Sequence, residues 1–546
     1  MHLRSLAWLF CVPIRSVEAA RRAAGRLNVL WLLVDDLRPQ LNLAYGQQET
    51  STPALDALAA KSVIFERAYC QVSVCAPSRN SFLTGRRPDS IGVYNFVDHF
   101  RSTTPDAVSL PQWFVLHGYV TLGAGKTYQP GKPPDYDAGK SWSKEMPYLA
   151  LMKNLTRCHT SLFGKPFDVC PEKAPHSEFM DSRTADYALK AMEVARRHRK
   201  NFFVAAGFYR PHLRWHVPHE FYAPYASRRL SVPKRTRRTP ARMPDVAWAN
   251  EGCHTLTTKN ATERMMIRKP VSNAATEELR RGYYAAVSWV DFCAGRVLKG
   301  LEAGGLGRDT IILLSSDHGF HLGEQGSWTK HTLFEVGVRV PLMLHVPGLT
   351  LRLQRTQAFV ELTDIYRTLA DFAGLPPPAN DVQGVSMRQI VQGDAAVRNY
   401  SVSQYPRCPR KPDTLWDANC KRQAARDIGM MGYSLRVRGF RFTEWYHWKA
   451  DGRFGAIDTA AALVATELYA LDEATASDFD SFEATNIATE DTALCVVEAL
   501  RAALRLFVHV CQAADVADAC HARIAHLVDI KRRCPLHARA GTALAR

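Results

Sequence analysis

The sequence lacks any apolar run that approaches the ~20 residues of a membrane-spanning helix. It also lacks a helix-turn-helix, zinc-finger or RNP pattern, although its net charge of +17 would suit a nucleic acid. These absences argue against a transmembrane helix and against the common DNA- and RNA-binding modules. With 46% apolar and 23% charged residues, the composition is that of an ordinary globular protein.

Several local features favour the secretory pathway. A short apolar run after Arg4, from Leu6 to Ile14, is typical of a signal peptide within residues 1–26. Two cysteine pairs, each twelve residues apart, lie in polar sequence where short-range disulfides can close, and neither has metal-ligand spacing: Cys158 with Cys170, and Cys408 with Cys420. Three N-glycosylation sequons begin at Asn154, Asn260 and Asn399.

Positive charge is densest between residues 228 and 242, a stretch that contains no acid and is interrupted by Pro233 and Pro240. Its cations are Arg228, Arg229, Lys234, Arg235, Arg237, Arg238 and Arg242. This composition predicts an exposed loop. Either the loop is merely solvated or it contacts an anionic partner such as a sulfated polysaccharide, and the sequence leaves both readings open.

Apolar patterning predicts the fold class. Three continuous apolar runs, at 28–34, 202–206 and 310–315, are typical of strands buried on both faces. Helical patterns cover 182–197 and 277–301. Strands that alternate with helices indicate an α/β fold, with a mostly parallel central sheet and helices on both of its faces.

This architecture predicts where chemistry would occur, because open α/β sheets bind ligands outside the carboxyl ends of their strands. Asp35 and Asp36 follow the first run, and Asp317 and His318 follow the third. We therefore expect these four side chains to meet at one edge of one sheet.

The most specific motif runs from Cys75 to Arg86 and reads C-A-P-S-R-N-S-F-L-T-G-R. It resembles the sulfatase signature C-x-P-S-R-x-x-x-L-T-G-R. In that family the cysteine is converted after translation to formylglycine, whose hydrated aldehyde is the nucleophile. A lone cysteine would ordinarily be interpreted as a half-buried thiol in a loop. The agreement along the motif favours the nucleophile.

The chemistry of a sulfate ester explains why such a residue is useful. An ordinary hydroxyl that attacks sulfur leaves an enzyme ester that is hard to cleave. With a hydrated aldehyde, one oxygen attacks sulfur, and deprotonation of the other then re-forms the aldehyde and expels sulfate. Arg79, within the same motif, would favour the deprotonated diol as a nearby positive charge does.

Further segments are similar to sulfatases that remove the 2-sulfate from terminal iduronate in heparan and dermatan sulfate, within the alkaline-phosphatase-like superfamily. They are V-D-D-L-R-P at 34–39, G-Y-V-T-L at 118–122, S-D-H-G-x-x-L-G-E-x-G-x-W-x-K at 316–330 and S-Q-Y-P-R at 403–407. The likeness spans about residues 27–472. It places the two short-range cysteine pairs where that family has disulfides.

The resemblance implies one Ca²⁺ per chain, because oxygen ligands suit a hard cation that neutralises sulfate oxygens. Its implied ligands are Asp35, Asp36, formylglycine 75, Asp317 and His318. The implied catalytic and sulfate- or uronate-binding residues are Cys75, Arg79, Lys126, His212 and Lys330. The lysines suit a sulfate oxygen or a carboxylate, and His212 suits protonation of the leaving alcohol.

One position departs from the family. A histidine is expected three residues after Lys126, and this sequence has Gln129. Glutamine cannot accept a proton near neutral pH, so general-base assistance worth ~10²–10⁴-fold would be missing. The sequence leaves three explanations: slow turnover, compensation by His321 or His99, or loss of catalysis with retained binding.

We therefore expect a sulfatase acting on 2-sulfated terminal iduronate, made for the lysosome or the secretory pathway and modified by a formylglycine-generating enzyme. The expected organisation is a leader at 1–26, a catalytic sulfatase domain at 27–390, a smaller domain with an antiparallel sheet at 391–490, and a helical tail at 491–546 without an assigned role. The alternatives are a hydrolase of another sulfate or phosphate ester, and a catalytically weak protein that binds glycosaminoglycans.

Overall fold

We describe the chain from a computed structural model. The residues described are 25–150, 167–248, 255–257, 262–264, 267–378, 381–394, 398–408, 420–451, 454–457, 463–472, 478–511 and 517–534. Residues 1–24 of the expected leader, Cys158, Asn154 and Asn260 lie outside them.

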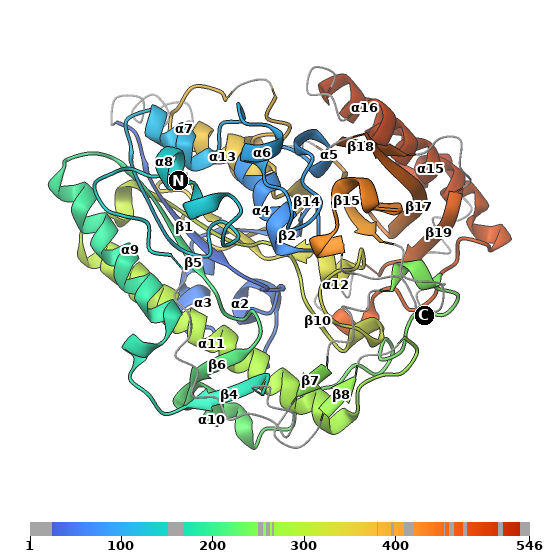
Figure 1. The fold of residues 1–546 in the computed structure, drawn as a ribbon, viewed down its shortest axis with the longest axis horizontal. Coiled ribbons are helices and arrows are strands. Elements are labelled where there is room, and N and C mark those ends of the chain that lie inside the picture. The colour runs from blue at the N-terminus through green and yellow to red at the C-terminus, as the bar shows by residue number, and fades with distance from the viewer. Residues whose placement is uncertain are drawn as a thin grey trace, which may run out of the picture.

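A mixed sheet of eight strands forms the centre of the molecule (Figure 1). Its path is β12-β2-β13-β9-β1-β5-β3, with β14 paired to β2. The strands are β1 (Asn28–Val34), β2 (Val63–Tyr69), β3 (Val120–Gly125), β5 (Phe202–Phe208), β9 (Thr310–Ser316), β12 (Arg339–Val340), β13 (Leu342–His345) and β14 (Gln354–Glu361). Strands β3, β5, β1 and β9 run parallel, whereas β13 is antiparallel to its neighbours.

Helices cover both faces of this sheet, as β1 shows residue by residue. Leu30, Leu32 and Val34 enter one apolar core, which they share with helices α9 (Met180–Arg197) and α11 (Asn273–Ala303). Val29, Trp31 and Leu33 enter the other, with α4 (Cys75–Thr84), α7 (Leu110–Leu116) and α13 (Asp364–Phe372). Every residue of β1 is buried, which accounts for its unbroken apolar run.

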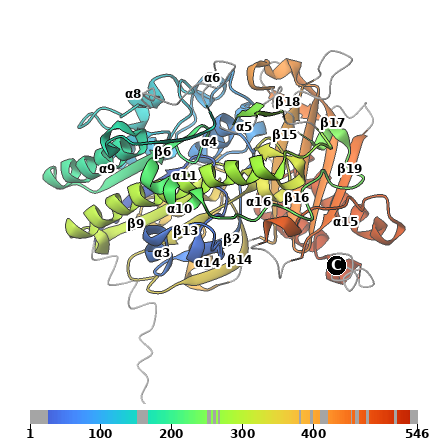
Figure 2. The same ribbon diagram turned by 90° about the horizontal axis from the view of Figure 1, so that it is seen from below.

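A second, antiparallel sheet follows in the chain (Figure 1, orange and red). Its strands are β15 (Tyr400–Arg407), β16 (Met430–Val437), β17 (Phe440–Asp451), β18 (Phe454–Ile457) and β19 (Leu463–Ala470). The tail helices α15 (Leu494–His509), α16 (Ala517–Leu527) and α17 (Ile530–Arg533) pack on it, and Figure 2 shows α15 beside the strands. Leu500, Leu504 and Phe507 of α15 share an apolar core with Leu435 and Phe442.

Smaller elements connect these layers. The remaining helices are α2 (Asn42–Tyr45), α3 (Pro53–Ala59), α5 (Pro88–Ile91), α6 (Phe100–Thr103), α8 (Ala138–Ser141), α10 (His219–Ala226), α12 (Glu335–Val338) and α14 (Arg388–Gln392). The remaining strands are β4 (Val169–Glu172), β6 (Trp215–Pro218), β7 (Thr255–Thr257), β8 (Thr262–Arg264), β10 (His321–Leu322) and β11 (Trp328–Thr329).

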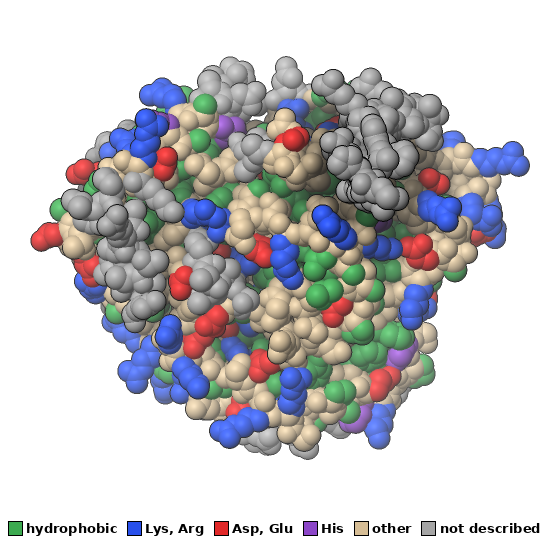
Figure 3. Space-filling model, turned by 180° about the vertical axis from the view of Figure 1, so that it is seen from behind, with side chains coloured by type: hydrophobic (Ala, Val, Ile, Leu, Met, Phe, Trp, Pro, Cys, Tyr) green, Lys and Arg blue, Asp and Glu red, His purple; other side chains and the backbone are tan. Residues whose placement is uncertain are grey.

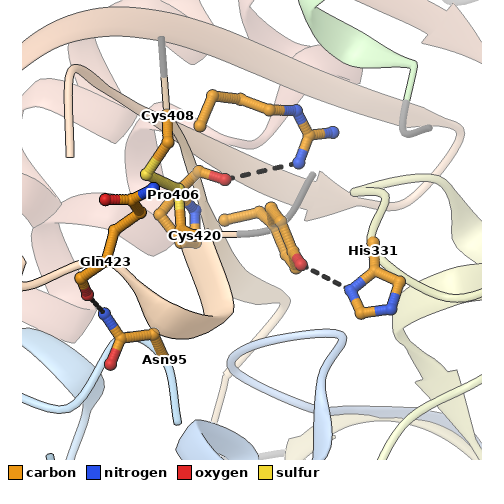
Figure 4. The surroundings of a disulfide bond; sticks show 8 residues. Asn95, His331, Pro406, Cys408, Cys420 and Gln423 are labelled. Atoms are coloured by element: carbon orange, nitrogen blue, oxygen red, sulfur yellow. Dashed lines mark hydrogen bonds between the residues drawn. A yellow bond between two sulfur atoms is a disulfide. The ribbon is translucent and has the colours of Figure 1, made fainter. Parts of the chain in front are cut away.

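Three disulfides with both cysteines among the described residues lie in the second half of the chain. The expected Cys408–Cys420 bond is present just beyond β15 (Figure 4), and two more join Cys495 to Cys534 and Cys511 to Cys520 within the tail. Cys170 is also disulfide-bonded, and its expected partner Cys158 lies outside the described residues. Beside the Cys408–Cys420 bond, Asn95 donates to the carbonyl of Gln423 at 2.5 Å.

The predicted fold class is confirmed. The predicted strands at 28–34, 202–206 and 310–315 correspond to β1, β5 and β9, and the two predicted helices to α9 and α11. None of the helices described is both long and apolar enough to cross a membrane. The domain limits at 27–390, 391–490 and 491–546 stay a prediction.

Candidate active site

The carboxyl ends of β1 and β9 carry the first group of candidate residues. These strands are parallel neighbours, paired from Asn28 with Thr310 to Val34 with Ser316, so the residues that follow them emerge side by side. Asp317 accepts a hydrogen bond at 3.1 Å from the backbone nitrogen of Asp36. The residues of this edge are fully buried, namely Asp35, Asp36, Asp317 and His318.

Cys75 is the first residue of α4, and its side chain reaches this group. Its Sγ lies 3.7 Å from Oδ1 of Asp35, 3.3 Å from Nε2 of His318 and 3.5 Å from Nζ of Lys126. Helix α4 is held against β9 by Ser78, whose hydroxyl donates to the carbonyl of Asp317. The signature cysteine therefore occupies the middle of the cluster.

Three buried cations pair with the three carboxylates. Arg79 lies on the same side of α4 as Cys75, one turn later, and donates to Asp35 at 2.9 Å and to Asp317 at 3.0 Å. Lys126 follows β3 and pairs with Asp35. Lys330 donates to both oxygens of Asp36, at 2.6 and 2.7 Å. Carboxylates and cations are thus equal in number at this centre.

The close packing of β3 against β5 places Lys126 at the site. Its backbone nitrogen donates to the carbonyl of Gly207 at 2.8 Å, where β3 and β5 end together. Gly125 has φ +68°, and a Cβ there would lie 2.0 Å from the same carbonyl. Only glycine can occupy this position without moving the strand ends apart.

Lys330 is supported from the second sheet. His331, the next residue, bonds through Nδ1 to the hydroxyl of Tyr405 on β15 at 2.6 Å, and Figure 4 shows this contact beside the Cys408–Cys420 bond. Arg407 at the end of β15 lies over the Tyr405 ring at 4.7 Å. The second sheet therefore helps to place a cation of the site.

Two histidines present a ring nitrogen to the cluster. In His318, Nδ1 bonds to the carbonyl of Gly319 at 2.9 Å, and in His212 it bonds to the carbonyl of Leu213 at 2.6 Å. Because a carbonyl only accepts, Nδ1 carries the proton in each ring. Nε2 of the neutral ring is then an acceptor. Nε2 of His318 lies 3.4 Å from Asp36 and 3.5 Å from Asp317.

Burial and charge act in opposite directions on the titratable groups. Burial would raise the pKa of Asp35, but Lys126 and Arg79 hold that pKa well below its usual value. Burial raises the pKa of the Cys75 thiol to about 12, against the attraction of Lys126 and Lys330. Burial, together with the same two lysines, lowers the pKa of His212 well below its usual value.

Residues that the sequence analysis missed hold the Asp35–Asp36 turn. Asp36 has φ +60°, in the left-handed region that few residues adopt. Tyr283 of α11 donates to the carbonyl of Asp36 at 2.8 Å and accepts from the backbone nitrogen of Arg38 at 3.0 Å. Ser316 accepts from the backbone nitrogen of Leu37 at 2.9 Å. No local signal identifies Tyr283, because it lies far along the chain in an apolar helix.

The position of the missing histidine is also informative. Oε1 of Gln129 is buried and accepts no hydrogen bond within the described part of the chain. His321, one suggested substitute, uses both ring nitrogens, toward the carbonyl of Glu324 at 3.1 Å and the hydroxyl of Thr332 at 2.7 Å. His99, the other, precedes α6, and Nδ1 of its ring is buried without a partner among the described residues.

The donor atoms are close enough to hold a metal ion. In each of two overlapping sets, one atom from every residue lies within 4.8 Å of the others: Asp35, Asp36, Cys75 and His212, and Asp35, Cys75, Asp317 and His318. The structure thus brings together every residue named from the sequence as a ligand or catalytic group, and the second sheet adds support that the sequence did not indicate.

Comparison with known proteins agrees with this arrangement. The family model described as Sulfatase matches residues 27–375, which include all nine candidate site residues. This chain belongs to the sulfatase family. It is therefore a hydrolase of the family that acts on sulfate esters, and its cluster of carboxylates could bind a metal ion.

Curated relatives of this sulfatase span most of its length. It is 31% identical to iduronate 2-sulfatase of Mus musculus over 80% of this chain and 88% of the relative. It is 30% identical to iduronate 2-sulfatase of Homo sapiens, over 82% and 91%. Choline-sulfatase of Rhizobium meliloti strain 1021 is 27% identical, over 68% and 72%.

Solved structures share the fold of this sulfatase. A phosphonate monoester hydrolase from Silicibacter pomeroyi superimposes with a TM-score of 0.64 and 22% identity, covering 89% of this chain and 97% of that one. A protein described as a 2-O GAG sulfatase gives 0.62 and 19%, covering 93% and 94%. At these identities the likeness concerns the fold alone.

Proposed function

We propose that this sulfatase hydrolyses the 2-sulfate ester of terminal iduronate in heparan and dermatan sulfate. The observation that carries the proposal is the convergence of Cys75 with three carboxylates and three cations at the carboxyl ends of β1, β3 and β9. The similarity to the mammalian iduronate 2-sulfatases supports the choice of substrate.

Residue 75 would act as formylglycine, formed from Cys75 by a formylglycine-generating enzyme that recognises the surrounding motif. One hydroxyl of its hydrate would attack sulfur, with Arg79 and Lys126 next to it. Their positive charge favours the deprotonated oxygen. Loss of a proton from the second hydroxyl would then release sulfate.

The donor set fits a hard divalent cation, and we propose Ca²⁺. Asp35, Asp36 and Asp317 offer carboxylate oxygens, residue 75 would add a diol oxygen, and Nε2 of His318 completes the set. When bound, the ion would neutralise sulfate oxygens and lower the pKa of the attacking hydroxyl. Since the carboxylates and cations already balance, a divalent ion would leave the centre positive, which suits an anionic ester.

The remaining residues would orient the substrate and assist the leaving group. Lys126 and Lys330 are buried cations that suit a sulfate oxygen or the carboxylate of a uronate. His212 is neutral near pH 7, so its Nε2 donates to the leaving alcohol only in the protonated ring, which acidic surroundings favour. We place the sulfatase in the lysosome or elsewhere along the secretory pathway, and the disulfides among the described residues agree with this. The sequon residue Asn399 is exposed, as a glycosylation site must be.

Two measurements test the proposal. Mass spectrometry of the peptide that contains residue 75, from cells that possess the modifying enzyme, should show formylglycine. The purified protein should then release sulfate from a disaccharide with a terminal 2-sulfated iduronate, faster than it releases phosphate from an aryl phosphate. An unmodified thiol, or faster release of phosphate, would contradict the proposal.

A second candidate is a catalytically weak protein that binds glycosaminoglycans, and Gln129 is the observation that favours it. Its buried Oε1 can accept a hydrogen bond from the diol but cannot remove a proton. We expect the variant Gln129→His to raise turnover about tenfold or more, within the range of general-base assistance. An unchanged rate would show that this position does not limit turnover. Binding of heparin without any release of sulfate would favour the second candidate.

A further inference from the structure

The basic loop, residues 228–242, lies beside the segment that carries Lys330. Pro233 packs 3.7 Å from where a Cβ on Gly323 would be, and the backbone nitrogen of Thr239 lies 3.2 Å from such an atom on Gly326. Gly326 precedes Lys330 by four residues, which span at most about 14 Å. The loop therefore contacts the segment that leads to Lys330.

Hydrogen bonds hold the backbone of this loop in place. Asp480 accepts from the backbone nitrogens of Lys234, Arg235 and Thr236 at 2.7, 3.0 and 2.8 Å. On the other side, Arg280 donates to the carbonyl of Ser231 at 2.7 Å, and the same guanidinium donates to Glu324 at 2.7 Å. A loop fixed from both sides presents its side chains at defined positions.

Part of the positive charge of the loop is exposed and unpaired among the described residues. Lys234, Arg235 and Arg238 are exposed, and no carboxylate of the described residues pairs with any of them. The carboxylate of Asp480 does not pair with these side chains. Its oxygens accept hydrogen bonds from the backbone amide groups and from the hydroxyl of Thr236. Figure 3 shows Lys and Arg side chains gathered along the lower left margin of one face of the molecule.

We propose that the basic loop is a docking surface for the sulfated polysaccharide chain behind the sugar that enters the active site. The inference rests on the proposed function, because it assigns the loop to the polymer whose terminal sugar would be the substrate. The sulfates and carboxylates of such a polymer complement exposed cations on a loop whose backbone is fixed. Affinity for a long chain then exceeds affinity for a disaccharide, and the difference falls as salt rises.

The test compares two triple variants of the full chain that lose the same charge. One is Lys234→Gln, Arg235→Gln, Arg238→Gln. The control is Lys200→Gln, Lys299→Gln, Arg308→Gln, whose cations are exposed and lie toward the opposite edge of the sheet, before β5, late in α11 and before β9. Binding of a heparin dodecasaccharide and of a heparin disaccharide is measured at one ionic strength, with sulfate release from the disaccharide as a second readout.

We expect the loop variant to bind the dodecasaccharide about threefold to tenfold more weakly than the wild type, with binding and turnover of the disaccharide unchanged. The control should match the wild type throughout. Equal losses in both variants, or an equal loss for duplex DNA of matched charge, would overturn the docking surface. If the wild type releases no sulfate, the proposed function fails, and the dodecasaccharide comparison still decides the role of the loop.

Discussion

Two of the clusters of buried ion pairs in the described part of the chain resemble each other at first sight. The site cluster joins Asp35 and Asp317 with Arg79. The Glu361 cluster joins Glu361 and Asp364 with Arg87 and Arg398. All of these side chains are buried or nearly so.

The clusters differ in what surrounds the carboxylates. Glu361 accepts from the backbone nitrogen of Val402 at 2.8 Å, and Asp364 from that of Val385 at 2.9 Å, so these acids connect β15 and the segment after α13 to the sheet. In the site cluster, a potential nucleophile at Cys75 and the acceptor nitrogen of His318 lie among the charges. A cluster of buried ion pairs can therefore serve either stability or catalysis. A cluster that also contains a potential nucleophile or a proton acceptor is the better candidate for catalysis.

The largest expected effect tests the site cluster. Cys75→Ala removes the proposed nucleophile, and we expect sulfate release to fall on the order of 10⁴-fold or more, with little change in melting temperature. Cys293→Ala, at another buried free cysteine, should keep its activity per folded molecule. Residual activity within tenfold of the wild type would mean that residue 75 is not the nucleophile.

In the Glu361 cluster we expect a substitution to lower stability and to leave activity nearly unchanged. Glu361→Gln leaves Arg87 and Arg398 buried with less counter-charge, which should lower the free energy of unfolding by about 3–5 kcal/mol. Urea denaturation measures this loss, while turnover per folded molecule should stay within about threefold. Glu193→Gln, at an exposed ion pair with Arg196, serves as the control and should leave stability unchanged. A large fall in turnover would show that the two clusters are coupled.

A buried acid outside both clusters predicts pH dependence. Glu467 accepts from Trp445 at 2.8 Å and from Tyr469 at 2.6 Å, and burial raises its pKa to about 7. Because the folded state holds this proton more tightly than the unfolded state, stability should fall as pH rises from about 4.5, the usual pKa, through about 7. The loss is of the order of 1–3 kcal/mol. Glu467→Gln should reduce the fall of the unfolding free energy over this window, to which Asp291 and Glu483 also contribute because burial raises their pKa values to about 7 and about 8. An unaltered slope would assign the whole fall to these other groups.

The smallest effect concerns the support of the site. Tyr283→Phe removes two hydrogen bonds from the Asp36 turn, and we expect kcat to fall about fivefold to tenfold, with KM little changed. The neighbouring Tyr284→Phe removes a contact with Glu49 and should leave kcat unchanged. Tyr283 acts here as a positioning residue. Equal effects of the two variants would point to a general loss of packing.

The sequence predicted the parallel core and the meeting of the site residues for one physical reason. Buried parallel strands need continuous apolar runs, and the polar residues that follow neighbouring strands must then emerge at one edge. Cys75 was recognisable because its motif is local. The roles of Tyr283 and Tyr405 were not recognisable, although Tyr405 lies in the S-Q-Y-P-R segment, because each acts on the site through tertiary packing from a distant element.

Cysteine pairing shows the same limit. The spacing of Cys408 and Cys420 made a short-range bond a reasonable expectation, and the structure contains it. The four cysteines of the tail allowed several pairings, and only the placement of α15 against α16 and α17 distinguishes them. The tail was predicted as amphipathic helix, but nothing in its pattern indicated that it would pack on the second sheet.

The disulfides of the tail have a practical consequence for producing the protein. The bond between Cys495 and Cys534 closes a loop of 39 residues, and in the chain-entropy description such a bond stabilises the folded state by about 4 kcal/mol. A reducing cytosol would keep these thiols apart and leave α15 held by apolar packing and by the ion pair of Arg501 with Glu444. A host that exports the chain to an oxidising compartment should therefore yield more folded protein than cytosolic expression, before activity is considered at all.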